Sequence, residues 1–356
     1  MRILFLGENW YGSCARACCS GLRRLGHDVS DIDSQTIFPQ LRKRSSRALR
    51  RILDSRLTAE YNELVLDLAS TFSPDILIAF KAPHLRAATL SSLRKQGIAL
   101  YNYYPDTSVF AHGSLLPEAL PEYDCVFFTK KFLDKDVRAR IPLRQSVFLP
   151  HGYDPELHKP HELDERDREQ YGHDVGFVGT YTSQKEQLLM KLVRSKPDID
   201  LHIWGNQWAE NCQAEGLKKL IKGAPLNGTS YAKALGGFRI NLGIMSGLVS
   251  GASQGDETTT RTYEIPACRG FMLHERTSEV LELFKEDKEI ACFNSVDELA
   301  QKIDYYLAHE EERKAIAAAG HKRCVPAYSY DNRMAELVAW HVAHSSTHDR
   351  SGARSI

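Results

Sequence analysis

Short apolar runs recur along the first half of the chain, and stretches with helical periodicity separate them. The apolar runs are expected to be buried strands, at Arg2–Gly7, Asp28–Ile32, Asp75–Phe80, Ile98–Tyr103, Asp124–Phe128 and Gln145–Leu149. The helical stretches cover Ser13–Leu25, the polar and basic region Ser45–Ser70, and Leu85–Gln96. Strands that alternate with helices favour a parallel sheet covered on both faces.

The second half repeats this alternation. Its expected strands are Asp174–Val178, Leu201–Trp204, Phe238–Leu242, Gly270–His274 and Glu289–Phe293. Its expected helices are one that begins at Ser183, then Val296–Ala308, Glu310–Cys324 and an amphipathic stretch at Tyr330–His344. The pattern therefore predicts an α/β protein with two Rossmann-like domains.

A Pro- and charge-rich stretch after Pro150 sets the expected domain limits. We expect a first domain at 1–150, a linker at 151–171 and a second domain at 172–328. A helix at 329–345 and a disordered tail at 346–356 complete the chain. Open parallel sheets bind ligands beyond the carboxyl ends of their strands, so two such sheets facing each other predict a cleft.

Composition limits the cellular compartments and the classes of binding partner that are expected. The 356 residues carry a formal net charge of zero, which gives no indication of a nucleic-acid partner. No apolar run approaches the length that crosses a bilayer, and the run at 1–7 is too short for a secretory signal, so a cytoplasmic location is expected. The eight cysteines form no Cys-x-x-Cys pair, and Cys14, Cys18 and Cys19 are expected to be buried thiols rather than metal ligands.

The segment richest in candidate chemistry runs from Asp256 to Glu264, two carboxylates eight residues apart after a Gly-containing approach at 251–255. A helix is expected between them, and a helix N-terminus offers free N–H groups and a favourable dipole to an anion. The hydroxyls expected to cap this helix or bind phosphate are those of Thr258, Thr259 and Thr260. Two plainer interpretations stay open: Asp256 as the helix N-cap, and Glu264 as a surface carboxylate.

A second candidate is the strand end and loop of Gly176–Lys185. Gly179 lets the chain approach a ligand closely, and Thr180 follows it. Lys185 is the candidate cation for a diphosphate, whose negative charge grows as it leaves; a solvated lysine is the alternative. Arg261 is the other candidate cation.

These residues resemble a known family. The Asp256-x7-Glu264 spacing is similar to the Glu-x7-Glu motif of retaining glycosyltransferases of the GT-B fold, with Asp in place of the first Glu. A closer resemblance, along nearly the whole chain, is to the spore-maturation (CgeB-like) glycosyltransferases. The motifs that carry it are Phe80-Lys-Ala-Pro-His84, Asn102-Tyr-Tyr-Pro-Asp106, His151-Gly-Tyr-Asp154, Gly176-Phe-Val-Gly-Thr-Tyr181 and Arg261-Thr-Tyr-Glu-Ile-Pro-Ala-Cys268.

The resemblance implies transfer of a sugar from a nucleotide-diphosphate-sugar donor held in the second domain, with retention at the anomeric carbon, and a last helix that crosses back to the first domain. It also implies that Glu264 binds the donor ribose and that Asp256 lies beside the transferred sugar. Tyr231, in a loop expected to set nucleotide specificity, is a further candidate donor contact. The family usually has Gly directly after Ala-Cys, whereas here Arg269 precedes Gly270.

The first half supplies the acceptor-side candidates. Asp106 follows a strand and His112 lies six residues later, so either is a candidate to orient an acceptor hydroxyl. The basic run Arg42–Arg51 is a candidate for peripheral contact with a membrane or a lipid-diphosphate acceptor, with a solvated face as the alternative. The acceptor class stays open among carbohydrate, lipid-linked and protein hydroxyls.

No cofactor and no metal are expected for this chemistry. The loop at 7–13 lacks a full GxGxxG, and no DxD-type metal motif lies in a loop after a strand. Two rival functions remain: a GT-B sugar-nucleotide epimerase, and a nucleotide-sugar-binding or spore-surface structural protein without turnover. Asp256 in place of Glu, and Arg269 at a usual Gly, keep the second rival open.

Overall fold

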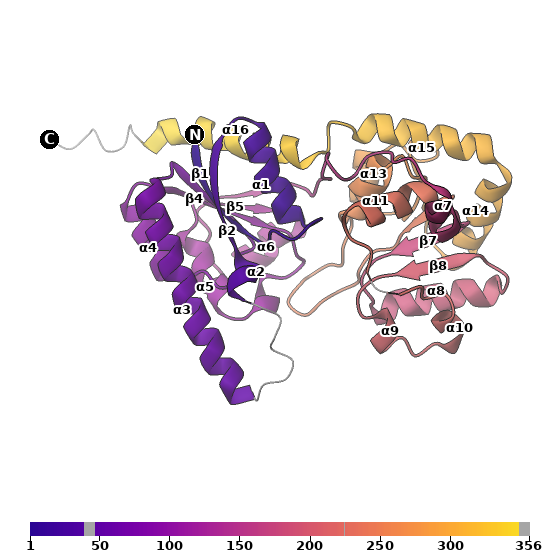
Figure 1. Ribbon diagram of the computed structural model, residues 1–356, viewed down its shortest axis with the longest axis horizontal. Helices are drawn as coiled ribbons and strands as arrows, with labels where there is room; N and C mark the ends of the chain where they lie inside the picture. Colours follow the sequence, from indigo (N-terminus) through magenta and orange to yellow (C-terminus); the bar gives the residue numbers. More distant parts are fainter. Residues whose placement is uncertain (39–46, 224, 349–356) are drawn as a thin grey trace. The chain divides into compact units, whose positions relative to one another are not determined.

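The computed structural model describes residues 1–38, 47–223 and 225–348, and Figure 1 shows their course. These residues form two compact units. The first comprises Met1–Pro150, Val249–Ser253 and the chain from Tyr330 onward, and the second comprises His151–Leu248 and Gln254–Ser329. No helix in the described part of the chain is long and apolar enough to cross a membrane.

The first unit is built on a six-stranded sheet with the order β2-β1-β3-β4-β5-β6, in which neighbouring strands run parallel. Its strands are β1 (Arg2–Gly7), β2 (Asp28–Asp33), β3 (Ile76–Phe80), β4 (Ala99–Tyr104), β5 (Cys125–Phe128) and β6 (Ser146–Phe148). Successive side chains of a strand point to opposite faces. In β1, Leu4 and Leu6 face one buried core, whereas Ile3 and Phe5 face the other. Burial on both faces explains the continuous apolar runs.

Helices cover both faces of this sheet. They are α1 (Cys14–Arg24), α2 (Ser34–Ile37), α3 (Arg47–Phe72), α4 (Ala87–Lys95), α5 (Leu115–Ala119), α6 (Phe132–Arg138), α16 (Tyr330–His348) and the 3-10 turns η2 (Val109–His112) and η3 (Leu120–Glu122). One core joins the sheet to α3, α4 and α5, and the other joins it to α1 and α16. Cys18 and Cys19 are buried in the second of these cores, as predicted, and Cys14 is partly buried.

The C-terminal helix α16 crosses back to the first unit, as the resemblance implies (Figure 1). Its apolar side chains Tyr330, Met334 and Leu337 are buried in the core shared with α1. At its start, both carboxylate oxygens of Asp331 accept hydrogen bonds from the Arg24 guanidinium, at 2.9 Å and 2.5 Å. The amphipathic pattern of the last helix is therefore explained by packing on residues more than 300 positions earlier.

The second unit contains a five-stranded sheet with the order β11-β10-β9-β7-β8, again with parallel neighbours. Its strands are β7 (Val175–Val178), β8 (Leu201–Trp204), β9 (Ile240–Gly243), β10 (Met272–Glu275) and β11 (Ala291–Phe293). Its helices are α7 (Glu165–Tyr171), α8 (Ser183–Ser195), α9 (Trp208–Asn211), α10 (Glu215–Lys218), α11 (Gly228–Gly237), α12 (Arg261–Ala267), α13 (Ser278–Leu283), α14 (Val296–Ala308) and α15 (Glu310–Cys324). Two parallel α/β units agree with the predicted GT-B fold class.

Three segments differ from their expected bounds or lie partly outside the described residues. The stretch 151–171, expected as a linker, is part of the second unit and ends in α7, where Asp164 and Asp167 form a capping box. Of the expected tail 346–356, the first three residues continue α16 and the rest lie outside the described residues. Of the basic run Arg42–Arg51, residues 42–46 lie outside the described residues, and only the helical backbone is described from 47 to 51.

Candidate functional site

The carboxyl edge of the second sheet is a topological switch point. Strand β7 lies between β8 and β9, so the chain leaves β7 and β9 toward opposite sides of the sheet. In open parallel sheets, ligands bind at this position, beyond the carboxyl ends of the strands. The loops that follow β7 and β9 contain most of the predicted donor-site residues.

A cavity of about 530 Å³ opens at this edge. Its lining comes from α8, from the loop after β9 and from the ends of β10 and β11. The charged side chains among its lining residues are Lys185, Lys191, Asp256, Glu275 and Arg276. Two of the predicted residues, Lys185 and Asp256, therefore share one cavity.

Lys185 is a buried cation in the first turn of α8. The turn is set by Thr182, whose hydroxyl accepts a hydrogen bond from the backbone N of Lys185. The Nζ of Lys185 donates to the backbone O of Thr180 at 3.2 Å and to the Oγ of Ser246 at 3.0 Å. Burial, with a further contribution from the charge of Arg261, lowers the pKa of Lys185 to about 8. The amine is thus not a solvated surface group.

Arg261 begins α12 and lies against the end of β7. Its Nη2 donates to the backbone O of Ile244 at 2.7 Å, and its guanidinium carbon lies 5.3 Å from the centre of the Phe177 ring. A Cβ atom at Gly179 would lie 2.6 Å from Nη1 of Arg261, so a side chain at this position would displace the guanidinium from the strand end. The Nε of Arg261 is buried without a hydrogen-bond partner among the described residues.

Two carboxylates accompany Lys185 in the cavity. Asp256 lies in the loop after β9, where its backbone N donates to the O of Ser246 at 2.8 Å. Glu275, at the end of β10, accepts a hydrogen bond from the backbone N of Met245 at 2.5 Å, and burial raises the pKa of its carboxyl group. The negative charge of both carboxylates acts to keep Lys185 protonated and so opposes the effect of burial.

The N-cap position of α12 is Thr260, one of the three threonines expected to cap this helix, although its side chain makes no capping hydrogen bond. Thr260 lies four residues after Asp256, so the interpretation of Asp256 as the helix N-cap is wrong. Thr258 is fully buried and donates to the Oε2 of Glu279 at 2.9 Å, which makes it a packing contact rather than a group open to phosphate. Thr259 and Thr260 are partly exposed.

Glu264 lies in a separate buried cluster on α12. Its Oε2 accepts a 2.6 Å hydrogen bond from the hydroxyl of Tyr231, and its Oε1 lies 3.9 Å from the Nε2 of His158. Burial and the charge of Glu264 raise the pKa of Tyr231 well above its usual value. Two predicted donor contacts are thus in direct contact, and the interpretation of Glu264 as a surface carboxylate is wrong because only 5% of the residue is exposed.

In the first unit, the two predicted acceptor-side residues also meet. The Oδ2 of Asp106, just beyond β4, lies 2.9 Å from the Nε2 of His112 and 2.6 Å from the Nζ of Lys81. Although burial opposes it, the hydrogen bond from His112 and the charge of Lys81 lower the pKa of Asp106. Lys81 and the next residue, Ala82, adopt left-handed backbone angles, with φ of 62° and 47°. Strained backbone of this kind is concentrated at functional sites.

Several side chains at these sites were not singled out from the sequence. Lys81 lies inside a quoted motif, Glu275 is the last residue of β10, and Ser246 and His158 lie a few residues beyond β9 and a quoted motif. A carboxylate at the end of a parallel strand is a usable signal, which Glu275 carries. His158 carries no such signal, because only the fold brings it to Glu264.

Known proteins match this chain in part of its sequence and in its whole fold. A family model described as "Glycosyl transferase-like" matches residues 183–339, which include the cavity and α12. The spore protein CgeB of Bacillus subtilis (strain 168) is 34% identical over 85 residues, which cover 24% of this chain and 25% of CgeB. The alignment thus spans about a quarter of the CgeB length. These matches confirm the resemblance to CgeB-like proteins.

Two solved structures show the same fold. The sucrose-phosphate synthase of Thermosynechococcus elongatus has a TM-score of 0.69 at 14% identity, covering 98% of this chain and 100% of the synthase. The Anabaena protein HepE, solved with UDP and glucose, has a TM-score of 0.61 at 12% identity, covering 96% of this chain and 100% of HepE. At these identities the likeness concerns the fold, and the chain has the GT-B fold.

Proposed function

We propose that this chain is a glycosyltransferase that moves a sugar from a nucleotide-diphosphate-sugar donor, bound at the carboxyl edge of the second sheet, to an acceptor hydroxyl. The observation that carries the proposal is the buried Lys185, hydrogen-bonded to Ser246 and Thr180 beside the Asp256 cavity. A buried cation in a cavity at a switch point is suited to a diphosphate, because the anion offsets the cost of burying the charge. The match to a glycosyl transferase-like family supports the same chemistry.

In this proposal the diphosphate lies near Lys185 and Arg261, which take up the negative charge that develops as the nucleotide leaves. No metal is required for that role. Asp256 lies at the sugar end, and Glu264 with Tyr231 holds the ribose. On the basis of the family resemblance, we also propose that the transferred sugar is a hexose and that its anomeric configuration is retained. HepE binds UDP and glucose, which makes a uridine donor the first to test.

The acceptor side is proposed for the first unit. At neutral pH the carboxylate of Asp106 is ionised, because its pKa is lowered. Its Oδ2 lies 2.9 Å from the Nε2 of His112, and a histidine positioned by a carboxylate in this way can accept the proton of an acceptor hydroxyl. Asp106→Asn is expected to reduce transfer to the acceptor while leaving donor affinity unchanged, and loss of donor affinity would place Asp106 elsewhere in the reaction.

The deciding experiment is a thermal-shift panel of nucleoside diphosphates and their sugars, followed by an assay of sugar transfer. A ligand at a hundred times its dissociation constant stabilises the native state by about 2.7 kcal/mol. A transferase consumes the stabilising donor faster when an acceptor hydroxyl is supplied. Release of the nucleotide and an epimerised sugar at a rate that does not depend on an acceptor would favour an epimerase. Binding of the nucleotide-sugar without its consumption would favour a binding protein.

A further inference from the structure

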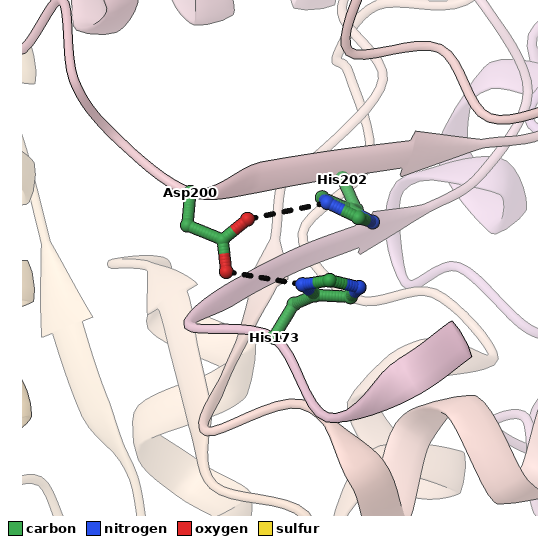
Figure 2. A group of neighbouring side chains, drawn as sticks. All are labelled: His173, Asp200 and His202. Atoms are coloured by element: carbon green, nitrogen blue, oxygen red, sulfur yellow. Dashed lines mark hydrogen bonds and ion pairs between the residues drawn. The ribbon is translucent and has the colours of Figure 1, made fainter. Parts of the chain in front are cut away.

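A second cluster of polar side chains lies at the opposite, amino-terminal edge of the same sheet. His173 comes from the turn before β7, Asp200 directly precedes β8, and His202 is the second residue of β8. Figure 2 shows both histidine rings beside the Asp200 carboxylate, with one oxygen directed at each ring. The Nδ1 of His173 lies 3.1 Å from Oδ2, and the Nε2 of His202 lies 3.2 Å from Oδ1.

The cluster has the spacing of a metal site. One ligand atom from each of the three residues lies within 4.8 Å of the others. Around a tetrahedral zinc ion with bonds of about 2.0–2.1 Å, neighbouring ligand atoms lie about 3.3 Å apart. The two nitrogen–oxygen separations of 3.1 Å and 3.2 Å are close to that value.

The rings are also arranged for a shared ligand. They stack with their centres 3.4 Å apart and their planes inclined by 29°, so two imidazoles present nitrogens to the same carboxylate. The Nδ1 of His202 is buried without a hydrogen-bond partner among the described residues, so the polar contact of this ring is the one that its Nε2 makes with Asp200. Asp200 is itself held by the backbone N of Asp174 at 3.2 Å, the kind of outer contact that orients metal-binding carboxylates.

We propose that His173, Asp200 and His202 bind one divalent transition-metal ion of the zinc type. Two imidazole nitrogens and a carboxylate oxygen are ligands that suit such an ion, and a fourth position remains for water. The ion would link the beginnings of β7 and β8. It would not take part in sugar transfer, because the proposed donor cavity lies at the other end of these strands.

The test is calorimetric titration of Zn²⁺ into the full chain after treatment with a chelator. We expect one equivalent to bind, with a melting temperature that rises with Zn²⁺ and returns on chelation. Asp200→Asn and His202→Gln should each weaken binding at least tenfold, since even outer-contact substitutions cost about 10–100-fold. His309→Gln, a change at an exposed histidine outside the cluster, is the matched control and should bind as the wild type does.

Circular dichroism of each variant separates loss of a ligand from loss of the fold, and Asp200→Asn keeps the size of the side chain and one acceptor oxygen. Absence of saturable Zn²⁺ binding by the wild type would overturn the proposal and leave a hydrogen-bonded cluster. Undiminished binding in both folded variants would overturn it too, because the ion would then bind elsewhere. Donor binding by the metal-free chain should be unchanged, so this outcome is independent of the proposed transferase activity.

Discussion

The Nζ of Lys185 lies 3.0 Å from the Oγ of Ser246, so the first turn of α8 and the loop after β9 meet through one buried cation. Among the residues that the structure describes, the hydrogen-bond partners of this amine are a hydroxyl and a carbonyl oxygen, not a carboxylate. A cation held by neutral groups keeps much of its attraction for an incoming anion.

Lys185→Met is expected to weaken nucleotide-sugar binding at pH 7 by about tenfold to a hundredfold, because hydrogen bonds to charged groups contribute about 1.5–3 kcal/mol. Since the pKa of Lys185 is about 8 in the free protein, wild-type affinity should fall as pH rises above that value. The affinity of the variant should stay level. Calorimetric titration at several pH values measures both trends, with Lys322→Met, an exposed lysine on α15, as control.

The same substitution should make the ligand-free protein more stable at pH 7. The folded pKa of Lys185, about 8, lies below the unfolded value, so the folded state binds fewer protons between about pH 8 and 10.4. The free energy of unfolding of the wild type therefore rises with pH between about pH 8 and 10.4. Below about pH 8 the buried amine is charged, so its full destabilising effect on the folded state is present. We expect Lys185→Met to gain on the order of 1–3 kcal/mol at pH 7 in urea unfolding. If the unfolding free energy of Lys185→Met exceeds that of the wild type by as much at pH 9.5 as at pH 7, the gain does not come from removal of a buried charge.

Asp256→Asn should lower sugar transfer about a hundredfold or more while nucleoside diphosphate affinity stays unchanged, because the bare nucleotide does not reach this side chain. The amide keeps the size of the carboxylate, and the backbone bond from residue 256 to Ser246 is unaffected. Glu257→Gln is the matched control: this neighbour accepts from the Ser278 hydroxyl and the backbone N of Glu279. That change should reduce stability rather than turnover. Equal rates for Asp256→Asn and the wild type would remove Asp256 from the reaction.

Glu264→Gln should lower affinity for a nucleotide by about tenfold to a hundredfold, because a charged acceptor for the ribose hydroxyls is lost. The hydrogen bond from Tyr231 can still reach the amide oxygen, so the fold should persist. Glu279→Gln, at another buried carboxylate of the second unit, should leave the affinity as it is. The affinity for UDP is measured for the wild type, Glu264→Gln and Glu279→Gln. Wild-type affinity in Glu264→Gln would show that Glu264 does not bind the ribose.

Arg269→Gly should stabilise the protein or leave it unchanged. Arg269 is exposed at the C-terminus of α12 with φ of 60°, the left-handed region in which a side chain costs about 1–2 kcal/mol. Removing that strain outweighs the entropy of the added glycine by up to about 1 kcal/mol. Lys314→Gly, inside α15, should instead lose about 1 kcal/mol. Chemical unfolding of both variants compares them, and a clear loss in Arg269→Gly would mean that its side chain has a contact worth the strain.

The sequence predicts the scaffold better than the site. Leu201–Trp204 and Val296–Ala308 have the same bounds in the structure as in the prediction, because continuous apolar runs and helical periodicity are local signals. The threonine run at 258–260 likewise marks the start of α12, whose N-cap position is Thr260. Lys185 and Ser246 are 61 positions apart, and their contact depends on β7 and β9 being neighbours in the sheet. The stacked histidines His173 and His202 likewise meet only through strand pairing.

The return of α16 to the first unit has a consequence for synthesis on the ribosome. Tyr330, Met334 and Leu337 complete the core that α1 begins, yet they are made roughly 180 residues after Pro150. At about 5–20 residues per second, the nascent first unit waits on the order of 10–40 s with one apolar face uncovered. During that interval the second unit emerges and can fold. Emergence of α16, rather than emergence of the first half of the chain, is therefore the event that allows the amino-terminal unit to complete its core.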